Sequence, residues 1–255
     1  MFSTLKKIFI NAPQEESFSI QGRKPAQEDS FFISEKKDYG QLFFVADGVG
    51  GHGHGDFASQ KTVEVFMNAF NNNFSTFKSV PDFIRVTAMV AAENVINKAL
   101  EDYSYKNCGT TLSGFFVSGD TYYTFNIGDS RVYLFSDGVL SRETRDHSIV
   151  QELLDSGQIT EDEAFKHPKR NIMTSAIGQD LSLMKIDISS PRTLIAGDVL
   201  MAFSDGVHDA LTDNMIFSIV KENKNTSGLA EKLVNSAFEA GGKDNITAVI
   251  FRYLG

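Results

Sequence analysis

Five places in this sequence put a carboxylate at the end of an apolar, strand-like stretch. They are Asp47 in FFVADG, Asp129 in FNIGDS, Asp205 in LMAFSDG, Asp244 in GGKDN and the pair Glu28 and Asp29 in QEDS. A single Asp-Gly is most often a turn. Carboxylates that gather at one place, however, raise each other's pKa unless cations neutralise them. Such a group would suit hard divalent ions with oxygen ligands, Mg²⁺ or Mn²⁺.

The surrounding elements decide whether these carboxylates can meet. Strands are predicted for SFSIQG, SFFIS, QLFFVA, CGTTLSGFFV, TYYTFNI, RVYLFS, LMKIDIS, DVLMAFS and ITAVIFRY, the fourth to sixth as an antiparallel meander. Helices are predicted over 56–70, 82–100, 148–156, 161–166, 213–222 and 227–240. Because strands and helices are grouped, we expect an α+β fold with antiparallel sheets, a four-layer sandwich of two sheets flanked by helices. Strands of a small sandwich end at common rims, where their terminal side chains can converge.

The stretch FFVADGVGGHGHGD has glycine at every second or third position after Asp47. A glycine after a metal-binding aspartate lets its carbonyl approach the ion, and further glycines keep the rim clear for a bulky ligand. The alternative is a mobile loop that leads to the helix at Asp56.

Composition narrows the class of protein. The chain has 255 residues and a formal net charge of -9, which disfavours a nucleic-acid partner. No apolar run is long enough to span a membrane. The single Cys108 reads as a small buried residue, and the lack of an internal disulfide favours a reducing, cytoplasmic compartment. We expect a monomer with one domain over residues 17–255. Residues 1–16 are expected to form a lead-in that is not a signal peptide. The alternative is that this lead-in has a weak docking or membrane-surface role.

A family resemblance covers residues 17–253. The pieces QEDSFFI, FFVADGVGGHGHGDFAS, CGTTLSGFFV, FNIGDSRVYLF, LMAFSDGVHDAL and GGKDNITAVIF, in this order, resemble the motif series of the protein phosphatase 2C family. The stretch that begins DHSIVQELLDSG resembles the flap-bearing region of bacterial members, and we call residues 142–180 the flap segment. The resemblance implies an αββα sandwich with two or three metal ions between its sheets.

The resemblance also implies a role for each acidic residue. It makes Asp47 the ligand that bridges two ions, and the Gly48 carbonyl would bind one of them. Asp205 and Asp244 would bind the first ion, and Glu28 and Asp29 the second, directly or through water. Asp129 and Asp205 would together hold a third ion. Asn245 would lie behind these ligands. The implied activity is hydrolysis of phosphoserine and phosphothreonine in proteins by a water or hydroxide that bridges the metals, without a covalent phosphoenzyme.

Two positions depart from the family pattern. Lys24 stands where members commonly have an arginine that contacts the substrate phosphate, and Arg23 precedes it, so both remain candidates for that contact. Val49 stands where eukaryotic members have a histidine that acts as general acid. The leaving oxygen would then be protonated by metal-bound water.

Three further questions stay open at this point. A pseudophosphatase that only binds partners, or a dedicated regulator of one signalling protein, would share the fold. The flap segment carries Lys166, Lys169 and Arg170, which suit a phosphorylated or acidic partner such as a substrate protein or a cognate Ser/Thr kinase, but it also reads as a solvated helical insert. No histidine has metal-ligand spacing, so His52, His54, His147, His167 and His208 are expected to face solvent or bond to loops.

Overall fold

Two antiparallel sheets form the centre of the computed structural model, which describes residues 12–50 and 54–255. One sheet has the order β1-β12-β11-β7-β8, with β1 Glu15–Ile20, β7 Arg131–Ser136, β8 Val139–Arg142, β11 Val199–Phe203 and β12 Ile246–Arg252. The other has the order β10-β6-β5-β3-β2, with β2 Asp29–Ile33, β3 Gln41–Val49, β5 Leu112–Ser118, β6 Thr121–Ile127 and β10 Arg192–Thr193. Short strands β4 Gly109–Thr110 and β9 Asp187–Ile188 pair with β3 and β6.

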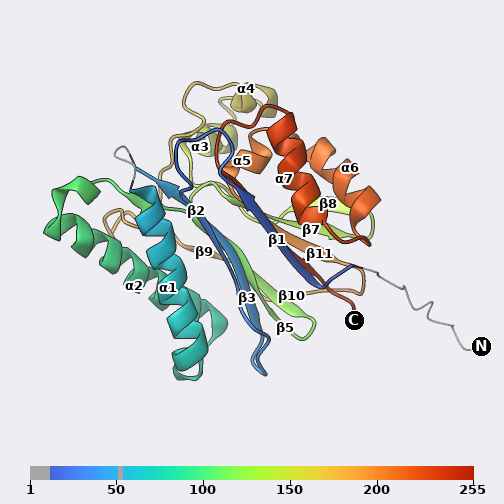
Figure 1. The fold of residues 1–255 in the computed structure, drawn as a ribbon, viewed down its shortest axis with the longest axis horizontal. Coiled ribbons are helices and arrows are strands. Elements are labelled where there is room, and N and C mark those ends of the chain that lie inside the picture. The colour runs from blue at the N-terminus through green and yellow to red at the C-terminus, as the bar shows by residue number, and fades with distance from the viewer. Residues whose placement is uncertain (1–11, 51–53) are drawn as a thin grey trace, which may run out of the picture.

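Helices cover the outer face of each sheet (Figure 1). The second sheet is covered by α1 Gly55–Asn73 and α2 Val80–Glu101, and the first by α5 Asp205–His208, α6 Asp213–Asn223 and α7 Leu229–Glu239. The flap segment, with α3 Ile149–Asp155 and α4 Glu161–Phe165, lies at one end of the sandwich. The expected α+β sandwich with four layers is therefore confirmed.

Strand β3 shows why its sequence is apolar without alternation. Phe43 and Val45 pack between the two sheets, whereas Leu42 and Phe44 pack against α1 and α2. Both faces of β3 are therefore covered, so neither favours polar side chains. At the end of β3, Asp47 is the cross-strand partner of Asp29 on β2. Directly paired residues point to the same face of a sheet, so the register alone brings these two carboxylates together.

The predicted meander over residues 108–136 is wrong at its last step. Strands β5 and β6 pair as expected, but β7 belongs to the other sheet. The GDS turn is a crossing between sheets, and Gly128 adopts a φ of 100° there, which favours glycine. The crossing carries Asp129 along the end of the sandwich.

Other differences from the predicted elements are local. Strands β8 and β10 and the short helix α5 were not predicted, and of the strand predicted over 183–189 only β9 forms. Strand β1 begins at Glu15, within the expected lead-in, most of which lies outside the described residues. Among the helices described, none is both long and apolar enough to cross a membrane.

Candidate active site

The backbone of Asp47 is held by two threonines of the CGTT motif. The Thr111 hydroxyl oxygen accepts from the Asp47 amide at 2.9 Å, and the Thr110 hydroxyl donates to the Asp47 carbonyl at 2.9 Å. The Thr111 amide donates to the same carbonyl at 2.9 Å. Sequence reasoning recognised this motif but gave it no role; a Thr-Thr pair at the start of a buried strand was the available signal.

Gly48 and Gly55 let the end of β3 touch the start of α1. A Cβ built on Gly48 would lie 2.3 Å from the Gly55 carbonyl oxygen, so the contact needs glycine. The Gly48 amide donates to the Glu28 carbonyl at 3.1 Å, and Glu28 Oε1 accepts from the Gly55 amide at 3.1 Å. The Glu28 carboxylate therefore caps α1 while lying beside Gly48. Close backbone packing explains these two glycines; residues 51–53 lie outside the described part of the chain.

Asp29 is 8% exposed and is held by hydroxyl groups from the residue that follows β11 and from β12. Its Oδ2 accepts from Ser204 at 2.8 Å and from Thr247 at 2.6 Å, while its Oδ1 is buried without a hydrogen-bond partner. Burial raises the pKa of Asp29 to about 6 against the opposing effect of the two hydroxyls. Neither hydroxyl was predicted, although Ser204 immediately precedes Asp205.

Asp205 and Asp244 come from the neighbouring strands of the other sheet. Asp205 follows β11 and begins α5, and Asp244 precedes β12. Burial raises the pKa of both Asp47 and Asp205 well above the usual range, and each also feels the negative charges of Asp29, Asp129 and Asp244. Asp205 Oδ1 is a second buried oxygen without a partner. We call Asp29, Asp47, Asp205 and Asp244 the carboxylate rim.

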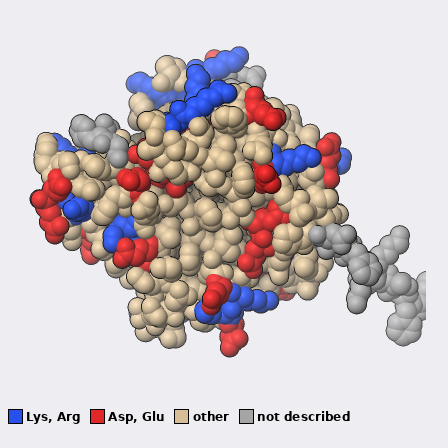
Figure 2. Space-filling model, viewed as in Figure 1, with Lys and Arg blue, Asp and Glu red and all other residues tan. Residues whose placement is uncertain are grey.

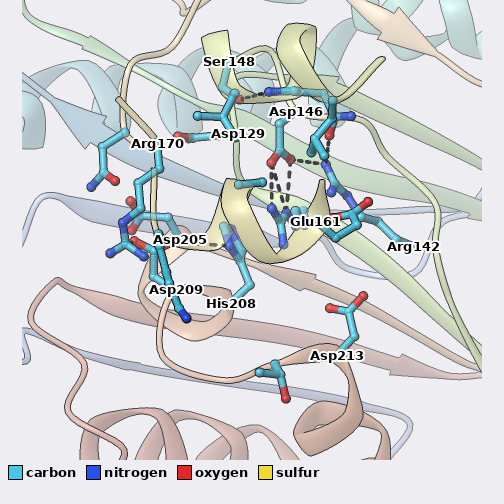
Figure 3. A pocket seen from close by; sticks show the side chains of 18 of the residues that line it. Asp129, Arg142, Asp146, Ser148, Glu161, Arg170, Asp205, His208, Asp209 and Asp213 are labelled. Carbon is cyan, nitrogen blue, oxygen red and sulfur yellow. Dashed lines mark hydrogen bonds and ion pairs between the residues drawn. The ribbon is translucent and has the colours of Figure 1, made fainter. Parts of the chain in front are cut away.

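Asp129 lies on the side of the rim that faces the flap segment. With Asp205 it lines a cavity of about 520 Å³ between the flap segment, α5 and the start of α6 (Figure 3). Burial, and then the charge of Asp146, raise the pKa of Asp129 to about 7. Asp146 is paired with Arg131 at 2.8 Å and with Arg142 in the wall of the same cavity. The cavity thus adjoins the rim rather than containing it, because Asp29, Asp47 and Asp244 are not among its lining residues.

His147 joins the GDS loop to the flap segment. Its amide donates to the Gly128 carbonyl at 2.8 Å, and its Nδ1 accepts from the Gly128 amide at 3.3 Å. Its Nε2 contacts Asp187 on β9 at 3.0 Å, and its carbonyl accepts from the Thr174 amide at 2.8 Å. The expectation of a loop-bonding histidine is confirmed, and the loop it holds is the one that carries Asp129. Sequence spacing could not reveal this contact.

The other histidines differ in environment. His54 stacks on Tyr105 with ring centroids 4.2 Å apart, and His167 Nδ1 accepts from the Lys169 amide within a turn. His208 is buried in α5, where burial and then the charges of Arg131 and Arg142 lower its pKa well below the usual range. It is therefore neutral at neutral pH and is no cationic acid. His52 lies outside the described residues.

The two candidates for the phosphate contact point in different directions. Lys24 Nζ lies 2.9 Å from Asp244 Oδ1, at the carboxylate rim. Arg23 is exposed, and its guanidinium lies 5.1 Å from the centre of the Phe238 ring on α7. The structure therefore brings Lys24, and not Arg23, to the acidic residues.

The donor set fits hard divalent ions. The rim offers carboxylate oxygens, and two of them are buried without partners. No three acidic, histidine or cysteine side chains in residues 12–50 and 54–255 are grouped as a preformed metal site. Two of the rim carboxylates are bonded to protein partners, Asp244 to Lys24 and Asp29 to the Ser204 and Thr247 hydroxyls. Since Mg²⁺ and Mn²⁺ prefer oxygen ligands, the carboxylate oxygens of the rim suit them.

Comparison with known proteins identifies the family of the chain. The family model for protein phosphatase 2C matches residues 19–235. The serine/threonine phosphatase stp of Listeria monocytogenes is 31% identical over 226 residues, which cover 88% of each chain. The solved S. agalactiae serine/threonine phosphatase is 31% identical with a TM-score of 0.84, covering 94% of this chain and 100% of that one. The catalytic domain of the phosphatase PstP, solved in complex with two manganese ions, is 26% identical with a TM-score of 0.81, covering 94% and 98%. The chain therefore belongs to the protein phosphatase 2C family and is a metal-dependent protein-serine/threonine phosphatase.

Proposed function

We propose that the carboxylate rim is the metal centre of this phosphatase. Asp47, the Gly48 carbonyl, Asp205, Asp244, Asp29 and Glu28 would hold two Mn²⁺ or Mg²⁺ ions, and Asp129 with Asp205 offers oxygen ligands for a third. The single observation that carries this proposal is that Asp29, the cross-strand partner of Asp47 in one sheet, accepts hydrogen bonds from Ser204 and Thr247, which lie next to Asp205 and near Asp244 in the other. Manganese is favoured for the test because the related PstP domain was solved with it.

The ions, when bound, supply the positive charge that holds a phosphate dianion and lowers the pKa of a water molecule toward neutrality. The protein positions the carboxylates that would bind these ions. Thr110 and Thr111 fix the Asp47 backbone, and Ser204 and Thr247 fix Asp29, so the carboxylates keep their spacing when a charged substrate arrives. Lys24 is the protein cation that would contact the phosphate; a lysine neutralises it without the two-pronged geometry of arginine.

We place the substrate polypeptide along the flap segment of a single catalytic domain, residues 17–255. The cavity beside Asp129 opens between this segment and the body, and exposed Lys166 and Lys169 belong to the segment. Figure 2 shows Lys and Arg gathered over this end of the molecule, which suits phosphorylated proteins, including a cognate kinase. We also propose that the protein is a monomer, and its free, buried Cys108 suits work in the reducing cytoplasm.

The test is hydrolysis of a phosphothreonine peptide with Mn²⁺, with and without chelator. Turnover that needs Mn²⁺ and is lost in Asp205→Asn supports the proposed centre. Turnover that survives both chelation and Asp205→Asn would place the metal centre elsewhere. For the flap segment, exchange of residues 142–180 with those of another family member should alter peptide preference; unchanged preference would refute its role in substrate choice.

A further inference from the structure

The loop from Gln21 to Ala26 packs directly against the turn that carries Asp244. Gly22 has a φ of 63°, and a Cβ there would lie 2.0 Å from the Asp244 carbonyl oxygen. The Asn245 side-chain amide donates to the Gln21 carbonyl at 2.7 Å and to the Ala26 carbonyl at 2.9 Å. The Gln21 side chain in turn donates to the Lys24 carbonyl at 2.8 Å. These contacts fix the backbone of Lys24 beside Asp244, so the position of its side chain does not depend on the ion pair alone.

The Lys24 ammonium group is surrounded by negative charge. Its Nζ lies 2.9 Å from Asp244 Oδ1, with side chains 41% and 30% exposed. Burial alone would lower the pKa of Lys24, but the contact with Asp244 and the charges of Asp205 and Asp47 outweigh it and raise the pKa. Lys24 therefore interacts electrostatically with three of the acidic residues assigned to the metal ions.

A cation at this position must weaken the binding of one ligand of the site, the divalent metal ion, and strengthen the binding of the other, the substrate phosphate. It repels a divalent ion at Asp244 and occupies one of the oxygens that the ion would use, and it attracts a phosphate dianion. We propose that Lys24 is a built-in counter-cation of Asp244 that competes with the divalent metal ion, and that it passes to the substrate phosphate once the metal has taken its carboxylate. This rests on the proposed metal centre and adds to it a lysine that weakens metal binding and strengthens phosphate binding.

The experiment compares Lys24→Met with the wild-type enzyme after removal of metal by chelator. Mn²⁺ is titrated by calorimetry, and inorganic phosphate is then tested as a competitive inhibitor of the Mn²⁺-loaded enzyme. In Lys24→Met, the dissociation constant of the Mn²⁺ step that Asp244→Asn removes should fall about five- to tenfold, as expected for a partly solvated charge ~4 Å away. The inhibition constant for phosphate should rise by a similar factor.

Two variants separate this role from a general change in charge. Lys243→Met removes the same charge from the exposed residue before Asp244, and no ion pair joins Lys243 to Asp244 in the described part of the chain. It should shift both constants less than twofold. Lys24→Arg keeps the charge and should leave the Mn²⁺ constant near the wild-type value. Raising the salt concentration should shrink the difference between Lys24→Met and wild type, because exposed charges are screened.

The outcomes are distinguishable. Unchanged or weaker Mn²⁺ binding in Lys24→Met, with weaker phosphate inhibition, would reduce Lys24 to a phosphate contact and overturn the inference. An equal gain in metal affinity in Lys243→Met would also overturn it, since net charge would then be the cause. If the wild-type enzyme shows no Mn²⁺ step that depends on Asp244, the proposed metal centre fails, and not this inference alone.

Discussion

The carboxylate rim and the flap segment lie side by side but are held in different ways. The rim is fixed by strand register, by hydroxyl groups and by backbone contacts that need glycine. The flap segment is tied to the body at separate points: by the Arg170–Asp209 pair at 2.9 Å, by the His147 amide that donates to the Gly128 carbonyl at 2.8 Å, and by the short bridge between Ile177 and Thr110. This difference indicates that the proposed metal ligands belong to the sandwich itself, while the part proposed to choose substrates is an insert attached to it at separate points.

The largest effect should come from the rim itself. Asp205→Asn should lower kcat/KM by about a thousandfold or more, because it weakens the hold on ions that each contribute several kcal/mol to transition-state stabilisation. The same change should raise the melting temperature in chelator, since it removes one of several mutually repelling buried carboxylates. Peptide turnover and thermal unfolding measure the two effects. A variant that loses both activity and stability would mean that Asp205 is structural.

The next effect concerns the residues that position the rim. Thr247→Val keeps the side-chain shape but removes the hydroxyl that donates to Asp29 at 2.6 Å. We expect a loss of about 10- to 100-fold in kcat/KM or in Mn²⁺ affinity, the range for a residue that holds a metal ligand. The matched control is Thr226→Val, whose hydroxyl donates to the Asn223 carbonyl at an exposed site. Equal losses in the two variants would contradict a positioning role for Thr247.

The rim should also make metal binding depend on pH. Asp29 and Asp129 have pKa values raised from 3.8 to about 6 and about 7, so both lose protons when a cation binds. Mn²⁺ affinity should therefore rise at least about tenfold from pH 5.5 to 7.5. In chelator the folded state binds more protons than the unfolded state between about pH 4 and about pH 7, so stability should fall as pH rises through that range. Calorimetry in buffers of different ionisation enthalpy would count the protons released; none released would contradict the predicted protonation.

The smallest effect should come from His147, near the start of the flap segment. His147→Asn breaks the contacts with the Gly128 amide and with Asp187. We expect a loss of about fivefold in kcat/KM, because a displaced Asp129 loop leaves the rim in place. His167→Asn, which disturbs only a local turn, is the control and should stay within twofold. A loss as large as that of Thr247→Val would show that the flap segment is as tightly coupled to the chemistry as the rim is.

The same contrast explains what the sequence could predict. The apolar runs of β3, β11 and β12 and the carboxylates at their ends are local patterns, and they gave the sandwich and the candidate ligands. The placement of β7 in the other sheet depends on packing across the molecule, so a short GDS turn was misread as a hairpin. The different directions of Lys24 and Arg23 depend on contacts with Asp244 and Phe238, more than 200 residues away along the chain. Local spacing carries no information on such contacts.

Strand β12 has a consequence for synthesis of the enzyme. It lies between β1 and β11, and the turn before it supplies both Asp244 and the asparagine that anchors the 21–26 loop. A growing polypeptide that has reached only residue 240 on the ribosome therefore lacks an interior strand of one sheet and the Asp244 side of the proposed metal centre. Nascent chains should therefore be inactive until β12 has emerged.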